Sequence, residues 1–138
     1  MEIAAINEQL TAHEPDQMVL RGISGNGNTL TLAFLCDGGP AEDLEFVVTF
    51  ENPAVFHLPR ILHNTAVRFK PSSPERIKKL IPAVSYDESE HHPKGYVVVE
   101  LTDVAQTPYG YYVMADSVVG KWEPFRNAVK SPRRAPRG

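Results

Sequence analysis

The chain has 138 residues, of which 42% are hydrophobic and 22% charged, and its net charge is −3. This length and composition exclude wholesale disorder and fit one globular domain that folds without a metal or a disulfide. The single cysteine, Cys36, leaves no partner for an intramolecular disulfide, and no apolar run approaches the ~20 residues that cross a bilayer. We therefore expect a soluble, cytoplasmic protein without a cofactor and without membrane contact.

The first predicted elements are a helix and a hairpin. Isoleucine and leucine recur at helical spacing over residues 2–12, so a short amphipathic helix is expected to pack against the edge of a larger element. Residues 18–24 and 29–36 are rich in strand formers, and the Asn-Gly pair between them supplies the positive φ angles of a tight turn. The hairpin is the clearest structural signal in the sequence.

A third strand is predicted at residues 44–50. Its core face is expected to carry Leu44, Phe46, Val48 and Phe50. Glu45 and Thr49 fall on the opposite face and are expected to point outward. Because short connections join neighbouring strands in antiparallel fashion, the three strands are expected to form a meander.

The second half of the chain contains more short elements. Strands are predicted at residues 55–58, 66–70, 96–101 and 109–116, the last two forming an antiparallel pair. A helix of about two turns is expected between the Ser72-Ser73 cap and Pro82. Residues 118–122 either extend the last strand or anchor it to the core. The sequence thus predicts a β-rich α+β fold, either a mainly antiparallel sheet or a partly covered β-sandwich, with two short helices.

The polar segment 85–95 holds the densest group of metal-ligand side chains. Carboxylates and imidazoles bind borderline divalent metals, but their spacing here fits no known metal motif. The adjacent histidines would point to opposite sides of an extended segment. The sequence favours a solvated loop without metal. The alternative is a metal site formed by Asp87, Glu90, His91 and His92.

A small metal-dependent or hydrolase-like enzyme is an alternative function. Its site would gather the Asp87–His92 loop with His57, His63 and Asp37, since catalytic groups meet in space rather than in sequence order. No base accompanies Cys36, which is expected to be packed, and the two isolated histidines are expected to bond to backbone carbonyls. No catalytic residue is assigned, and the lack of an assembled motif favours a protein that is not an enzyme.

Three tyrosines on the strand 109–116 are the candidate partner-binding residues. Tyr109 and Tyr111 share one face of the strand, and Tyr112 lies on the other. Tyrosine is enriched at recognition surfaces because it combines a large contact area with a polar tip, but it also fills cores and sheet edges. The sequence leaves both roles open.

We predict one domain at residues 1–124 and a basic, flexible tail at residues 125–138. The acidic body does not suit nucleic acid, so any such contact would use the tail residues Arg126, Lys130, Arg133, Arg134 and Arg137. The leading hypothesis is a non-enzymatic protein-binding or accessory module that presents a β-sheet face or edge. An immunity-type inhibitor of a basic protein is a further alternative, and exposed edge strands would allow a homodimer.

Overall fold

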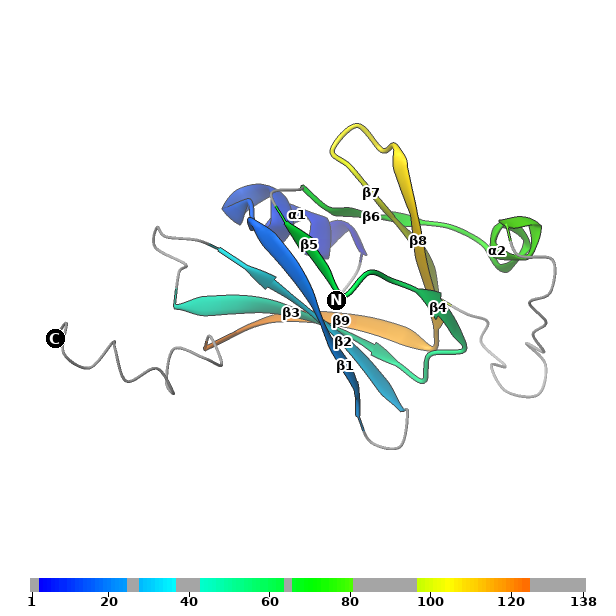
Figure 1. Ribbon diagram of the computed structural model, residues 1–138, viewed down its shortest axis with the longest axis horizontal. Coiled ribbons are helices and arrows are strands. Elements are labelled where there is room, and N and C mark those ends of the chain that lie inside the picture. The colour runs from blue at the N-terminus through cyan, green and yellow to red at the C-terminus, as the bar shows by residue number, and fades with distance from the viewer. Residues whose placement is uncertain (1–2, 25–27, 37–42, 64–65, 81–96, 125–138) are drawn as a thin grey trace, which may run out of the picture.

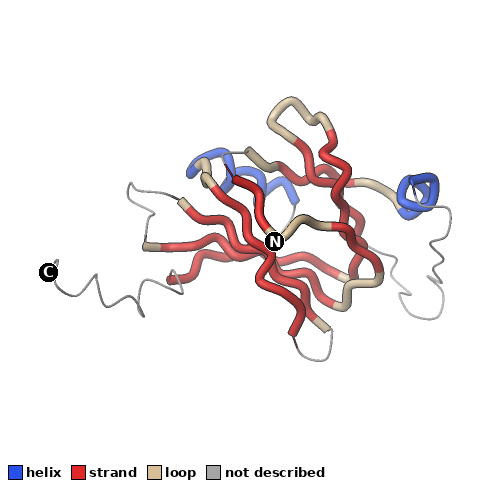
Figure 2. Tube along the Cα trace, viewed as in Figure 1, coloured by secondary structure: helices blue, strands red, loops and turns tan. Residues whose placement is uncertain are grey.

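The computed structural model describes residues 3–24, 28–36, 43–63, 66–80 and 97–124. These residues form two antiparallel sheets and two short helices, which lie at opposite sides of the molecule (Figure 1 and Figure 2). The predicted β-rich α+β class is therefore confirmed. The elements are α1 (Ile3–His13), β1 (Gln17–Ser24), β2 (Thr29–Leu35), β3 (Leu44–Glu51), β4 (Val55–His57), β5 (Ile61–His63), β6 (Arg68–Pro71), α2 (Pro74–Leu80), β7 (Val97–Thr102), β8 (Pro108–Ala115) and β9 (Ser117–Pro124).

The first sheet has the strand order β5-β1-β2-β3-β9. The predicted hairpin is β1–β2, with Met18 opposite Phe34, and β3 follows as the third strand of the predicted meander. A bulge between Leu20 and Gly22 interrupts the β1 ladder, and Gly22 adopts a φ of 115° there. Such a φ suits glycine because it has no Cβ.

The second sheet has the order β4-β8-β7-β6, and it contains the predicted antiparallel pair β7–β8. Between β8 and β9 the chain turns at Asp116 and changes sheets, so that β9 pairs with β3 along its whole length. Residues 118–122 therefore belong to a separate strand and do not extend β8. The short strand β5 was not predicted from the sequence.

The main core lies between the two sheets and is closed by α1. Phe34, Phe46 and Phe50 of the first sheet pack in one cluster with residues of the second sheet, including Phe69 and Leu101. The phenylalanine rings of the two sheets contact edge to face, with centroids 6.0 Å apart for Phe34 and Phe69. Both sheets thus bury their facing sides, which is the arrangement of a β-sandwich.

Helix α1 seals the gap between edge strands of the two sheets. Ile6 and Leu10 are buried in the core, in keeping with the predicted apolar stripe. On its flank, the Asn7 side chain donates to the Phe69 carbonyl at 2.7 Å and accepts from the Phe69 N–H at 2.9 Å. Asn7 thereby replaces a neighbouring strand along the outer edge of β6. The indole of Trp122, in β9, donates to Gln9 at 2.9 Å.

Helix α2 covers the outer face of the second sheet. Its Ile77 packs against Val98, Tyr112 and Met114 in a second buried cluster. Ser73 caps the helix, since its Oγ accepts from the Arg76 N–H at 3.2 Å. The buried Glu100 carboxylate accepts from the Ser72 hydroxyl at 2.8 Å and forms an ion pair with Arg76. No helix in the described residues is long and apolar enough to cross a membrane.

Glu45 points to the outer face of the first sheet, as predicted, but solvent does not reach it. The residue is only 1% exposed. The guanidinium of Arg21, the residue at the β1 bulge, reaches across and donates to its Oε1 at 2.7 Å. The alternation of apolar and polar residues along β3 correctly predicted which face of the sheet carries Glu45. The ion pair with Arg21 compensates for the burial of its carboxylate. Leu44, expected in the core, is 39% exposed at the start of β3.

Candidate functional site

Residues 55–63 pass from the second sheet to the first along one side of the sandwich. They contain β4, the edge strand beside β8, and β5, the edge strand beside β1 (Figure 1). We call residues 55–63 the bridging edge. Within the described residues, neither β4 nor β5 has a strand on its other side. An edge of this kind is a template on which another extended chain can pair.

The bridging edge exposes large apolar side chains. Phe56 is 37% exposed and Ile61 is 42% exposed. Leu58 and Leu62, from the same segment, are partly buried against the main core. The polar side chains of His57, Arg60 and His63 are exposed between them. Aromatic and arginine side chains are enriched at protein interfaces, and this edge exposes Phe56 and Arg60.

The backbone of β5 is oriented for pairing on its open side. The N–H of Leu20 donates to the carbonyl of Arg60 at 2.8 Å, which makes these two residues a hydrogen-bonded pair of the antiparallel ladder. Such pairs alternate along a strand, so the N–H and C=O of Ile61 point away from β1. Ile61 therefore presents both an exposed apolar side chain and outward-facing backbone groups.

Two of the candidate tyrosines lie beside this edge. The His57 ring lies 5.6 Å from the Tyr111 ring and 5.9 Å from the Tyr112 ring, measured between centroids. Tyr111 is half-buried against the main core, and Tyr112 is 4% exposed in the cluster below α2. Tyr111 is thus the one of this pair with surface to offer a partner. A partner-binding role remains a prediction.

Tyr109 lies further along β8 and packs, like Tyr111, against the main core. Its hydroxyl donates to the carbonyl of Ala66 at 2.8 Å. Burial, reinforced by the Asp103 carboxylate and opposed by Arg68, raises the pKa of Tyr109 above its ordinary value. Burial also raises the pKa of Tyr112. Both phenols therefore keep their protons at neutral pH.

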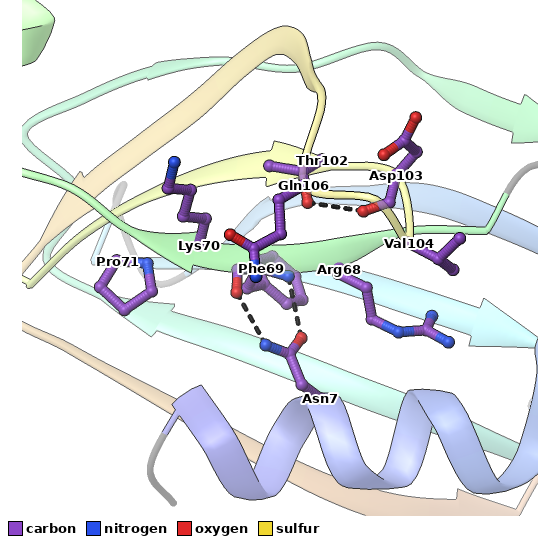
Figure 3. A pocket seen from close by; sticks show the side chains of 9 residues that line it. All are labelled: Asn7, Arg68, Phe69, Lys70, Pro71, Thr102, Asp103, Val104 and Gln106. Carbon is purple, nitrogen blue, oxygen red and sulfur yellow. Dashed lines mark hydrogen bonds between the residues drawn. The ribbon is translucent and has the colours of Figure 1, made fainter.

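A hollow of about 450 Å³ lies near the opposite edge of the second sheet, beside β6. The β6 side chains and the turn after β7 form its walls, and α1 lies below it (Figure 3). We call it the basic hollow, because its charged lining consists of Arg68, Lys70 and the single carboxylate of Asp103. Its lining residues are Asn7, Arg68, Phe69, Lys70, Pro71, Thr102, Asp103, Val104 and Gln106.

The turn after β7 is built around Asp103. Its carboxylate accepts from the N–H groups of Ala105 at 2.8 Å and Thr107 at 2.9 Å. The backbone N–H of Gln106 donates to the Asp103 carbonyl at 3.1 Å, and Gln106 adopts a left-handed φ of 67°. In Figure 3 the Gln106 side chain extends from this turn toward Phe69 of β6.

The predicted enzyme site is only partly within the described residues. Asp37 and the candidate metal ligands Asp87, Glu90, His91 and His92 lie outside them. His57 and His63 belong to edge strands of different sheets. The described residues contain no group of three or more His, Cys, Asp or Glu side chains that could hold a metal ion. The metal and enzyme hypotheses remain predictions.

Cys36 follows β2 and is half-buried. Its Sγ lies 3.7 Å from the carbonyl of His13. Burial, and secondarily the Asp16 carboxylate, raises the pKa of its thiol. A nucleophilic cysteine needs the opposite shift, so this environment gives Cys36 the character of a structural thiol.

Comparisons with known proteins identify no relative. The chain matches no model of a protein family, and searches of curated proteins and of solved structures return no similar protein.

Proposed function

We propose that this chain is a protein-binding module that accepts an extended segment of its partner along the bridging edge. The observation that supports the proposal is the exposure of Phe56 and Ile61 on edge strands that are open on one side. Burying two such side chains in a complex would contribute a few kcal/mol of apolar stabilisation, at ~25 cal/mol per Å².

Strand addition is the recognition mode that fits this geometry. An added strand gains affinity from backbone hydrogen bonds and specificity from alternating side chains. The outward-facing backbone of Ile61 would supply the hydrogen bonds, and the exposed Phe56 ring with the half-buried Tyr111 would supply the side-chain contacts that give specificity. The break at Pro59 limits the continuous ladder to short stretches, so affinity would depend on the apolar contacts.

The charge of the chain bears on the partner. The body outside residues 125–138 is strongly acidic, which would accelerate association with a basic protein. An immunity-type inhibitor is one form that this binding function could take. A second copy of the chain is another occupant of the edge. The free thiol of Cys36 suits a reducing compartment such as the cytoplasm.

The test is site-specific photo-crosslinking in lysate of the source cells. A photoreactive residue is placed at position 56 or 61, and a matched control is placed at Lys121, an exposed residue on the outer face of β9. We expect the same protein to be crosslinked from positions 56 and 61 and not from 121. Untagged wild-type chain should compete for that protein, whereas untagged Phe56→Ser/Ile61→Ser chain should not.

The composition of the crosslinked product shows which molecule binds the bridging edge. A crosslinked product that contains only this chain identifies a homodimer, and a product that contains a second protein identifies another partner. Equal crosslinking from position 121, or none from 56 and 61, would refute a binding site at the bridging edge. Unfolding curves of the double variant must match the wild type, so that loss of competition cannot result from loss of fold.

A further inference from the structure

We propose that the basic hollow is a binding site for a small, elongated organic anion that carries a negative group at each end. The hollow lies beside β6, whereas the bridging edge contains β4, and these strands are opposite edges of the second sheet. The site is therefore separate from the proposed protein-binding edge, and either proposal can fail without the other.

The charges of the hollow favour an anion. Within the described part of the chain, the Lys70 ammonium has no hydrogen-bond or ion-pair partner. Arg68 uses one N–H to donate to the carbonyl of Val67 at 2.8 Å, which leaves most of its donor groups for a ligand. The opposing carboxylate, Asp103, is already engaged by two backbone N–H groups. An anion would thus find two cations against one carboxylate, which already accepts two hydrogen bonds.

The spacing of the two cations determines the shape of the ligand. Arg68 and Lys70 are two residues apart on the same face of β6, so their Cα atoms are separated by about 6–7 Å. Their charged ends diverge toward opposite ends of the hollow (Figure 3). In the arrangement drawn, one compact anion would not contact both groups, whereas a molecule with two terminal anions would span them. A volume of about 450 Å³ is within the usual range for small-molecule sites.

The polar wall between the cations is already formed. Asn7 is fixed by its two hydrogen bonds to Phe69, and the turn carrying Gln106 is held by the Asp103 carboxylate. The Gln106 amide has no partner among the described residues and lies at the centre of the view, where it could donate to the middle of a ligand (Figure 3). A site fixed before binding loses less entropy when the ligand enters.

The test is isothermal titration calorimetry of the full chain at constant ionic strength, which measures the affinity for each probe. The probes are adipate, whose two carboxylates are separated by a chain of methylene groups, and pyrophosphate, a compact polyanion; acetate is a control that carries one carboxylate. We expect adipate to bind at least tenfold more tightly than acetate and more tightly than pyrophosphate, which would show that the separation of the two charges, and not the total charge, is recognised. Arg68→Gln and Lys70→Met should each weaken binding about tenfold, the effect of losing one charge-assisted contact.

Lys78→Met is the matched control, because Lys78 is an exposed lysine on α2 and its loss changes the net charge equally. It should alter affinity less than twofold. Gln106→Ala removes the amide that is proposed to donate to the middle of the ligand. It should weaken binding while leaving the unfolding temperature unchanged. The proposal is overturned if adipate does not bind at about 10 mM, if acetate or pyrophosphate binds as tightly, or if Lys78→Met weakens adipate binding as much as Lys70→Met.

Discussion

Replacing Asn7 by alanine should destabilise the fold measurably, although the residue lies on a surface helix. The substitution removes two hydrogen bonds, of 2.7 and 2.9 Å, to the backbone of Phe69. At about 1 kcal/mol per bond the loss is about 2 kcal/mol, and alanine's better helix propensity returns up to ~0.6 kcal/mol. The net destabilisation is therefore about 1.5 kcal/mol, or a fall of roughly 3–6 °C in melting temperature for a domain of this size.

Chemical denaturation of the wild type and three variants measures this effect. Glu8→Ala, at the next position of α1, is exposed and serves as the control for helix propensity. Asn7→Asp keeps the acceptor for the Phe69 N–H but loses the donor to its carbonyl, so it should also destabilise. Amide exchange at Phe69 should accelerate in both Asn7 variants. A change below about 0.5 kcal/mol for Asn7→Ala, with Phe69 still protected, would refute the role of Asn7 as an edge cap.

Four further predictions concern other parts of the chain. Because burial raises the pKa of Tyr112, the folded state retains that proton better than the unfolded state does, so stability should decline above about pH 10. Tyr112→Phe should flatten that decline in unfolding curves measured from pH 8 to 11. The thiol of Cys36 should react with a disulfide reagent at least roughly threefold more slowly in native protein than in denatured chain; equal rates would contradict its packing. Gly22→Ala should cost about 1 kcal/mol, since the bulge needs a φ of 115° although space for a Cβ exists; an unchanged denaturation midpoint would oppose this. Deleting residues 131–138 should leave the melting temperature nearly unchanged, and a fall of several degrees would show that the tail is structural.

Local signals in the sequence were sufficient for much of the fold. The hairpin β1–β2 and the strand β3 were predicted because a turn sequence and a two-residue alternation lie within one short stretch. The helix α2 was predicted from its serine cap, and Ser73 performs that role. Each of these elements depends on neighbours only a few residues away.

Pairing between distant strands could not be predicted in the same way. Nothing in residues 117–124 indicates that they pair with β3 rather than continue β8, since that choice depends on how the whole sandwich closes. The three residues of β5 are too few to show alternation. The burial of Glu45 was not predicted because its partner Arg21 reaches it from the bulge of β1. Gly22, a glycine inside the predicted strand, is a sign of such a bulge, but it does not show which side chain the bulge places beside Glu45.

The candidate sites were predicted in part. The sequence singled out Tyr111 and His57 separately, and the structure places their rings side by side. It could not show that Phe56 and Ile61 are exposed, because a phenylalanine or isoleucine in a strand normally indicates the core. The basic hollow brings together residues from α1, β6 and the turn after β7, which no spacing in the sequence connects.

The late position of β9 has a consequence for synthesis on the ribosome. The meander β1–β2–β3 emerges early, but β3 pairs with a strand that begins only at Ser117. Until then, one side of β3 offers unpaired backbone groups next to Phe46, Val48 and Phe50, side chains that are fully buried in the finished molecule. The nascent chain therefore exposes an unpaired strand edge until β9 has been synthesised. During that interval the edge of β3 could bind a chaperone or pair with another chain and aggregate.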